Sequence, residues 1–221
     1  MAAVLEVPLQ EYPIHAETDY DVIPAPRRFT VDEYYRLQEI GILSEDDHLE
    51  LIEGEILIMA PKGIKHSASS TRANRWFIRK LGNRAIVRNE QPIHLDDDSE
   101  PEPDLVVAAP VEDEYDYHHP IPAEVLLVIE VANSSLAFDR AEKNRLYARA
   151  GIIQYCILNL RDRTIEDYRH PGRRGYRSKE IYTEKQRFNL VAFPDIKVRV
   201  AELLPRQPNN LKSFQGSRKS G

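Results

Sequence analysis

The chain has 221 residues, of which 42% are apolar and 30% are charged, with 15 prolines against 9 glycines. This length and composition indicate one globular domain with irregular ends, since about 150 residues per domain is usual. The longest uninterrupted apolar run covers only residues 125–129, which excludes a membrane-spanning helix because a bilayer requires roughly 20 apolar residues.

No lysine or arginine precedes Arg27, so we expect neither a basic secretory leader nor an arginine-rich transit peptide. The single cysteine, Cys156, cannot form an internal disulfide. These features predict a cytoplasmic protein with no membrane partner.

The charges are unevenly distributed along the chain. Residues 1–133 carry 11 basic and 27 acidic residues, whereas residues 134–221 carry 19 and 9. Such asymmetry suggests an anionic partner for one surface, with the alternative that folding interleaves the two signs.

Residues 1–26 contain four prolines and no sustained hydrophobic period, which predicts an irregular N-terminal arm. Thr30 and Glu33 then form a capping-box pattern that starts a helix ending at Gly41. Further on, two apolar runs surround the pair Glu53-Gly54, which predicts a β-hairpin over residues 49–59.

A second helix is predicted over residues 65–81, with Ala68 and Trp76 on its buried stripe and Gly82 as its stop. Strands are predicted over residues 85–95 and 105–108.

Residues 124–131 are apolar on both faces, which is typical of a strand in the middle of a covered sheet. A helix with Asp139 as its N-cap should follow and end at Gly151. We expect a strand over residues 152–160 and then short antiparallel strands within residues 164–200.

The order of elements predicts an α/β or α+β fold, with a mixed sheet flanked by helices and a β-rich C-terminal part. We place the folded domain at residues 27–204. The segment 205–221 contains no acid and few apolar residues, and we predict that it is disordered.

Two acids at strand ends are the main chemical signal. Asp104 begins one predicted strand, and Glu130 closes the most apolar strand 26 residues later. A buried acid needs a compensating cation or hydrogen bonds, and carboxylates on neighbouring strands would suit Mg²⁺. The alternatives are that Glu130 pairs with an arginine or extends past the sheet edge.

Lys143 lies one turn into the helix that follows Glu130, and helical side chains lean toward the N-terminus. Its ammonium can therefore reach back toward the end of the strand. The alternative is a solvated lysine beside Glu142. Contact through one water between the Lys143 nitrogen and the carboxylates of Asp104 and Glu130 would favour catalysis, and a nitrogen in bulk solvent would favour an inert binder.

Several stretches carry a family resemblance. They are, in chain order, Leu49-Glu50-Leu51-Ile52-Glu53-Gly54-Glu55, His66 at a helix start, Pro103-Asp104-Leu105-Val106-Val107, Val128-Ile129-Glu130-Val131 with Ser134-Ser135, and Asp139, Lys143 and Tyr147-Ala148-Arg149-Ala150-Gly151. In this order they resemble the Uma-type family of restriction endonucleases, within the PD-(D/E)xK nuclease superfamily. The resemblance covers residues 29–204.

This resemblance implies a restriction-endonuclease-like core and an Mg²⁺-dependent phosphodiesterase site, with Mn²⁺ as a substitute metal. It implies that Asp104 and Glu130 are the metal-binding acids and that the Val131 carbonyl is a further ligand. Glu50 would complete the site or hold a second ion. The superfamily lysine belongs two residues after the second acid, where this chain has Ala132, so Lys143 would be its displaced substitute.

Further residues could contact DNA. His66 could contact a phosphate or assist the acids, with helix capping or simple exposure as its alternative. The basic turn containing Arg173, Arg174 and Arg177 could bind the backbone, with a solvated hairpin end as its alternative.

We therefore expect an Mg²⁺-dependent endonuclease that hydrolyses DNA, with Glu50, Asp104, Glu130 and Lys143 as catalytic residues and a homodimer as the form that cuts both strands. One rival is a catalytically weak or inactive DNA-binding or regulatory module with the same fold. A second rival is an interaction domain whose acidic and basic ends pair between subunits.

Overall fold

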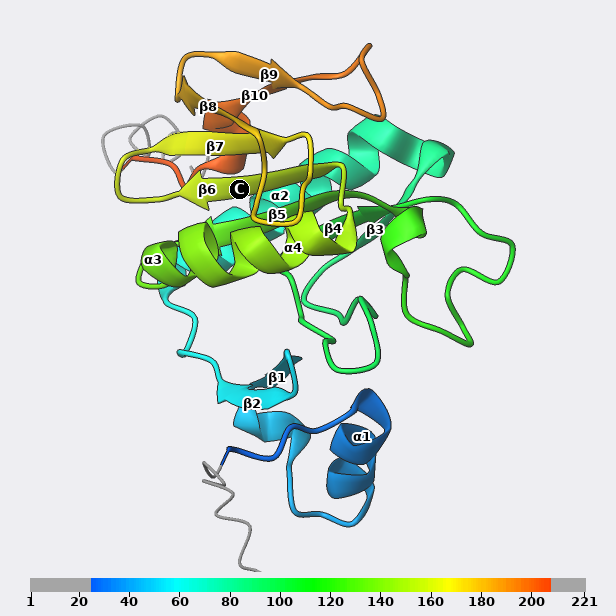
Figure 1. The fold of residues 1–221 in the computed structure, drawn as a ribbon. Coiled ribbons are helices and arrows are strands. Elements are labelled where there is room, and N and C mark those ends of the chain that lie inside the picture. The colour runs from blue at the N-terminus through cyan, green and yellow to red at the C-terminus, as the bar shows by residue number, and fades with distance from the viewer. Residues whose placement is uncertain (1–24, 208–221) are drawn as a thin grey trace, which may run out of the picture.

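The computed structural model describes residues 25–207 (Figure 1). The predicted N-terminal arm and C-terminal tail lie almost wholly outside this range. The centre of the fold is a six-stranded sheet in the order β3-β4-β5-β6-β7-β8. Its strands are β3 (Ile86–Arg88), β4 (Leu105–Ala108), β5 (Val125–Ala132), β6 (Gln154–Asn159), β7 (Thr164–Arg169) and β8 (Ser178–Thr183).

The apolar strand β5 lies inside the sheet, as its sequence predicts. It pairs antiparallel with β4 and parallel with β6, while the other neighbouring strands are antiparallel. The parallel pair requires a crossover, because parallel strands cannot be joined by a tight turn. That crossover consists of α3 (Leu136–Phe138), a π-helical turn (Asp139–Lys143) and α4 (Asn144–Ala150).

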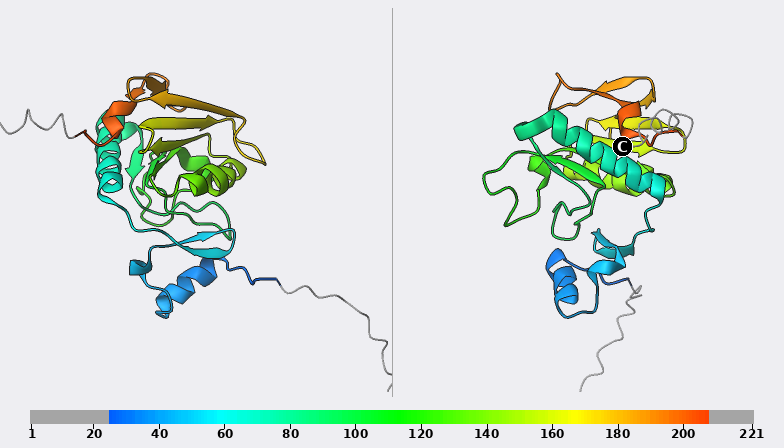
Figure 2. Two further views of the ribbon diagram at one scale, coloured as in Figure 1. Left: turned by 90° about the vertical axis from the view of Figure 1, so that its left-hand side faces the viewer. Right: turned by 180° about the vertical axis from the view of Figure 1, so that it is seen from behind.

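Helices cover both faces of this mixed sheet (Figure 2). The long helix α2 (Ile64–Leu81) and the short α5 (Val200–Leu203) pack on one face, where Trp76 and Phe77 join the core. The crossover covers the other face, where Leu146 and Tyr147 contact the sheet. The fold is therefore the mixed α/β architecture that the order of elements predicts.

An N-terminal lobe lies below the sheet in Figure 1. It contains α1 (Val31–Glu39) and the hairpin of β1 (Leu49–Ile52) and β2 (Glu55–Ile58). The capping box of Thr30 and Glu33 is present at the start of α1. In the hairpin turn Gly54 has a positive φ of 76°, and a Cβ atom there would lie 2.5 Å from Arg28 Cβ, so the turn requires glycine.

Two predicted elements differ from the structure on the N-terminal side of β5. The strand expected over residues 85–95 is limited to β3, because the chain leaves the sheet at Glu90, which has a positive φ of 54°. Ala68, expected in the core, is exposed, since Ser69 and Ala73 occupy the buried side of α2 instead. Short 3-10 turns cover Glu45–Asp47, Gly82–Arg84 and Pro122–Glu124.

The remaining differences lie after β5. The crossover helix begins at Leu136, so Asp139 is an internal residue and not the N-cap. The strand expected over residues 152–160 is β6 alone. At the C-terminal end, the three-residue strands β9 (Arg187–Asn189) and β10 (Lys197–Arg199) are too short to show a hydrophobic period, so their pairing in a hairpin was not predicted. The short helix α5 was not predicted either.

Within residues 25–207, no helix combines the length and the apolar composition needed to cross a membrane.

A buried acid on β7 ties the crossover to the edge of the sheet. Glu166 accepts hydrogen bonds from Arg140 Nε at 3.0 Å and Tyr168 Oη at 2.7 Å, and Lys179 Nζ lies 2.7 Å away. Burial alone raises the pKa of Glu166, but these donors outweigh it and lower the pKa from 4.5 to about 2. The ionised form therefore stabilises the fold, and this contribution is lost as the pH falls from 4.5 toward 2.

We predict that Glu166→Gln lowers the free energy of unfolding at neutral pH by about 1–3 kcal/mol, the usual range for hydrogen bonds to a charged group. The difference from the wild type should shrink as the pH falls below 4.5, which urea titrations at several pH values would measure. Glu180→Gln, on the exposed edge strand β8, is the control. A difference that stays constant with pH would contradict the prediction.

Candidate active site

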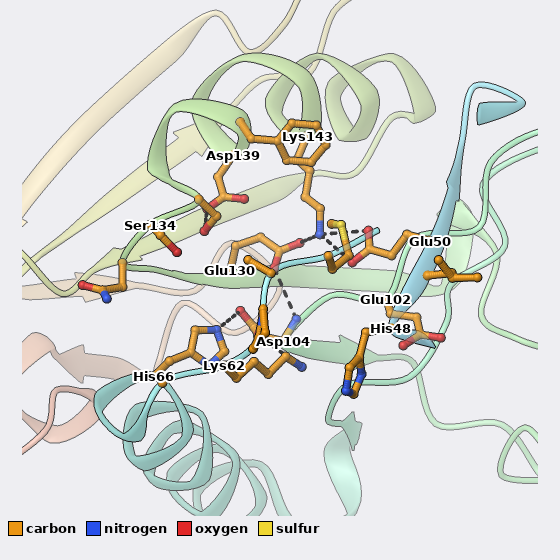
Figure 3. A pocket seen from close by; sticks show the side chains of 18 residues that line it. His48, Glu50, Lys62, His66, Glu102, Asp104, Glu130, Ser134, Asp139 and Lys143 are labelled. Atoms are coloured by element: carbon orange, nitrogen blue, oxygen red, sulfur yellow. Dashed lines mark hydrogen bonds and ion pairs between the residues drawn. The ribbon is translucent and has the colours of Figure 1, made fainter. Parts of the chain in front are cut away.

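A pocket of about 520 Å³ lies between the N-terminal lobe, the start of α2 and the loop that follows β5. Glu50, Asp104, Glu130 and Lys143 all line it (Figure 3). They come from β1, the start of β4, β5 and the crossover helix. All four side chains are at least nine-tenths buried.

The pairing of β4 and β5 places Asp104 beside Glu130. Leu105 pairs with Ile129 in antiparallel register, so Asp104, which immediately precedes β4, lies opposite Glu130 on β5. The Asp104 amide donates to Glu130 Oε2 at 3.3 Å, and the Val131 amide donates to Asp104 Oδ2 at 2.8 Å. These backbone hydrogen bonds fix both carboxylates to the sheet.

Lys143 lies in the centre of the pocket and not in bulk solvent. Its Nζ donates to Glu130 Oε1 at 2.9 Å and to Glu50 Oε1 at 3.1 Å. Tyr147, one helical turn later, also donates to Glu130 Oε1, at 2.8 Å. The lysine ends the π-helical turn Asp139–Lys143, a deviation that occurs frequently at functional sites.

The structure explains how a helix lysine reaches this position. Glu130 and Ala132 are two residues apart on β5, so their side chains point to the same face of the sheet. Ala132 packs in the cluster with Leu146 and Tyr147, which covers that face. A lysine from the covering helix therefore approaches Glu130 from the side on which a lysine at position 132 would lie.

Glu50 reaches the pocket because β1 is buried along its whole length. Leu51 packs in the core of the lobe with Val31 and Tyr34, and Glu50, its neighbour, points the opposite way. Its Oε1 accepts the hydrogen bond from Lys143, and its Oε2, which accepts no hydrogen bond within the described residues, also lies 3.1 Å from Lys143 Nζ.

Burial and like charges raise the proton affinity of this cluster. Burial is the largest cause that raises the pKa of Glu130 to about 8, with Asp104, Asp139 and Glu50 adding to it and Lys143 opposing it. Burial likewise raises the pKa of Glu50. Three carboxylates and one ammonium leave the cluster with an excess of negative charge when all are ionised.

Asp104 behaves differently because more donors reach it. Burial alone raises its pKa, but the hydrogen bond with His66, the charge of His66 and the Val131 amide lower it overall. His66 Nε2 lies 3.0 Å from Asp104 Oδ2, and Lys62 Nζ lies 3.6 Å from Oδ1. Asp104 is thus the acid of the cluster that ionises most readily.

A second group of possible ligands overlaps the site. His66, Glu90 and Asp104 lie close enough together to hold a metal ion. Lys62 Nζ is 3.1 Å from Glu90 Oε1, so a cation is already present beside this group. Glu90 follows the short strand β3, and sequence patterns gave no signal for it because the strand was expected to continue.

Asp139 is a further acid of the pocket that was expected only as a helix cap. Ser135 Oγ donates to its Oδ2 at 2.7 Å. Burial, with the charges of Asp104 and Glu50, raises the pKa of Asp139 to about 6, although the Ser135 hydrogen bond and Lys143 lower it. The i to i+4 spacing of Asp139 and Lys143 was the available signal.

The basic turn of Arg173, Arg174 and Arg177 is not part of this pocket. It belongs to the loop between β7 and β8, where Gly175 approaches Asn144 at the start of α4. His66, by contrast, lines the pocket from the first turn of α2.

A scan against protein-family models matches residues 31–201 to the Uma2 family, whose description reads "Putative restriction endonuclease". The chain belongs to the Uma2 family. The family resemblance of the sequence motifs is therefore confirmed. Membership of Uma2 supports a nuclease, a hydrolase that acts on nucleic acid.

A solved structure from Anabaena variabilis, titled a "putative nuclease belonging to DUF820", has the same fold as this Uma2 protein. The TM-score is 0.62 at 18% sequence identity, over 79% of this chain and 97% of the other. This likeness supports the restriction-endonuclease-like fold. No curated protein matches the chain.

The raised pKa of Glu130 predicts a pH effect on the stability of this Uma2 protein without added metal. The folded state retains the Glu130 proton up to about pH 8, whereas an unfolded glutamate loses it near 4.5. The folded state therefore binds more protons in this window, and its stability decreases as the pH rises.

We predict that, in EDTA, the wild type loses stability relative to Glu130→Gln as the pH rises from 4.5 to about 8, since the amide imitates the protonated acid. Urea unfolding midpoints of both proteins across this range test it. Parallel pH profiles would contradict the prediction.

Proposed function

We propose that this Uma2 protein is an Mg²⁺-dependent endonuclease that hydrolyses phosphodiester bonds of DNA, with Mn²⁺ as a substitute metal. The single observation that carries the proposal is the convergence of three buried carboxylates and one buried lysine in one pocket. Such a cluster is costly for folding alone. Because the chain belongs to a nuclease family, we attribute the cluster to catalysis and not to stability.

The donor set fits Mg²⁺. Magnesium prefers oxygen ligands and binds through one or two carboxylates, and Glu50, Asp104 and Glu130 supply only oxygens. The Glu50 Oε2 atom accepts no hydrogen bond among the described residues and lies 3.1 Å from the Lys143 ammonium, so a metal ion bound there would share it with Lys143. We propose Asp104, Glu130 and the Val131 carbonyl as ligands and Glu50 as the acid that completes the site.

When bound, Mg²⁺ supplies the Lewis acidity that activates water and offsets charge on the phosphate. Asp104 is held in its ionised form by Val131 and His66, so it presents a negative charge to the metal at neutral pH. The backbone hydrogen bonds of Asp104 and Val131 keep the ligand oxygens in fixed positions, and such preorganisation reduces the reorganisation needed during the reaction.

We assign Lys143 to charge stabilisation and not to proton abstraction. Despite burial, the charges of Glu130 and Glu50 and the Glu130 hydrogen bond raise its pKa, so its ammonium keeps its proton at every physiological pH. A permanent ammonium can donate hydrogen bonds to a phosphate oxygen and orient the attacking water. It cannot act as the general base.

A second candidate function is a DNA-binding or regulatory module with weak or no turnover. The observation that favours it is the pairing of Lys143 with both Glu50 and Glu130, because this ammonium offsets part of the negative charge without any metal. A module of this kind would bind DNA with no dependence on divalent cations.

Two further features belong to the proposal. Cleavage of both strands of a duplex favours two active sites, which supports a homodimer. The single buried cysteine, Cys156, and the DNA substrate support a location in the cytoplasm. Light scattering at several salt concentrations would test the dimer, and would also detect association driven by opposite charges, since salt screens it.

We predict that the wild type cleaves plasmid DNA in Mg²⁺ or Mn²⁺ and not in EDTA. Asp104→Asn and Glu130→Gln should reduce the rate at least about 100-fold, because loss of residues that merely support a metal ligand already costs 10–100-fold. Gel assays of supercoiled plasmid provide the measurement.

Glu142→Gln is the matched control for both variants, because Glu142 is exposed, adjoins Lys143 in sequence and pairs with Arg145 away from the pocket. Undiminished cleavage by either site variant would reject the assignment. DNA binding without cleavage, equal with and without divalent cations, would favour the inactive module.

We also predict that Lys143→Met abolishes detectable cleavage and, above about pH 8 where Glu130 is ionised, destabilises the metal-free protein by about 3–5 kcal/mol, because it leaves two buried carboxylates without their cation. Mn²⁺ should then raise the melting temperature of the variant more than that of the wild type. Equal shifts in both proteins would contradict the idea that lysine and metal compensate the same carboxylates. Lys143→Arg keeps the charge and controls for its loss.

A further inference from the structure

The segment between Glu55 and Glu90 contains no acidic residue and eight cations. Lys62 and Arg84 form ion pairs, with Asp104 and Asp195. The segment contains the whole of α2. The charge count for residues 1–133 does not reveal this basic segment, because that part of the chain is acidic overall.

Four of these cations lie on one side of α2 and form the α2 basic stripe, which consists of Lys65, Arg72, Arg75 and Arg79. Their spacings of seven, three and four residues bring them onto one line along the helix. At 1.5 Å per residue this line is about 21 Å long. The buried residues of α2, such as Ala73 and Phe77, lie on another side of the helix.

Within residues 25–207, no carboxylate forms an ion pair with any of the four stripe cations, although Lys62 and Arg84 show that the segment can form them. Burial and the neighbouring cations of Arg206 and Arg75 lower the pKa of Arg72, with Glu202 opposing them. Its buried Nε has no hydrogen-bond partner among the described residues. Like charges gathered without partners indicate an anionic ligand.

The α2 basic stripe begins beside the pocket, although none of its four cations lines it. Lys65 adjoins His66, which lines the pocket together with Lys62. From this end α2 runs across the outside of the molecule, as the right-hand view of Figure 2 shows. An extended polyanion with one phosphate in the pocket can therefore continue along the helix.

We propose that the α2 basic stripe binds the sugar-phosphate backbone of duplex DNA beside the cleavage position, an inference that rests on the proposed function for its substrate. Duplex DNA carries one negative charge per 1.7 Å of axis, so a straight line of cations matches it in charge and shape. Guanidinium groups also bind phosphates in a bidentate manner. These contacts position the substrate without reading its sequence.

The test uses the full chain with the Asp104→Asn substitution, in EDTA, so that binding is measured without cleavage or metal. The probe is a fluorescent duplex of about 30 base pairs, which is longer than the stripe at about 3.4 Å per base pair. Anisotropy titrations at several salt concentrations give the slope of log K against log salt. Each lost phosphate contact should reduce this slope by about 0.9.

The decisive variant is Arg75→Glu with Arg79→Glu, because both side chains are exposed and their substitution leaves the core intact. We expect its slope to fall by about 2 and its affinity at low salt to drop at least about 10-fold. Lys185→Glu with Arg187→Glu is the matched control, since it changes the net charge equally on exposed residues after β8 that have no assigned role in DNA binding.

An unchanged slope in the stripe variant, or an equal reduction in the control, would overturn the proposal. Equal competition by polyglutamate of the same total charge would also overturn it, in favour of an acidic protein partner. Cleavage by the chain without the Asp104→Asn change is assayed separately. If the stripe variant loses DNA binding but the wild type does not cleave DNA, the stripe proposal stands and the endonuclease proposal is rejected. If the stripe variant binds DNA as before and the wild type cleaves it, only the stripe proposal is rejected.

Discussion

The burial of Lys143 against the carboxylates of Glu130 and Glu50 is the interaction on which the site depends. Removing ions from water is expensive, and here four buried acids and the buried Lys143 share one pocket. The lysine joins the crossover helix to β5 and to the N-terminal lobe at once. Without it, repulsion among the acids would oppose the docking of the lobe on the sheet.

This arrangement separates a negatively charged pocket from a positively charged helix. A pocket of carboxylates repels a phosphate unless a cation lies between them, so the acids suit a metal better than DNA itself. The cations of α2 begin at the mouth of the same pocket and remain free of acidic partners within the described residues. In the proposed endonuclease the pocket binds the metal, and the α2 basic stripe binds the substrate.

Position 132 shows why the fold can tolerate a missing strand lysine. The side chain two residues beyond Glu130 points toward the crossover helix, so either the strand or the helix can supply an ammonium to the same volume. The π-helical turn and Tyr147, which also holds Glu130, fix the helix side of this contact. A regular α-helix with Asp139 as its N-cap would have placed its side chains at different angles around the helix axis.

The sequence by itself determined the covered central strand, the capped first helix, the tight hairpin and the family, because each rests on local patterns of polarity and turn residues. It also pointed to Asp104, Glu130, Glu50 and Lys143, through motif order. Only the tertiary structure decided that these side chains share one pocket with Asp139, that Glu90 lies beside Asp104, and that the cations of the α2 basic stripe have no acidic partner among the described residues. Local periodicity carries no information on which distant charges meet, since that depends on strand pairing and on how lobes pack.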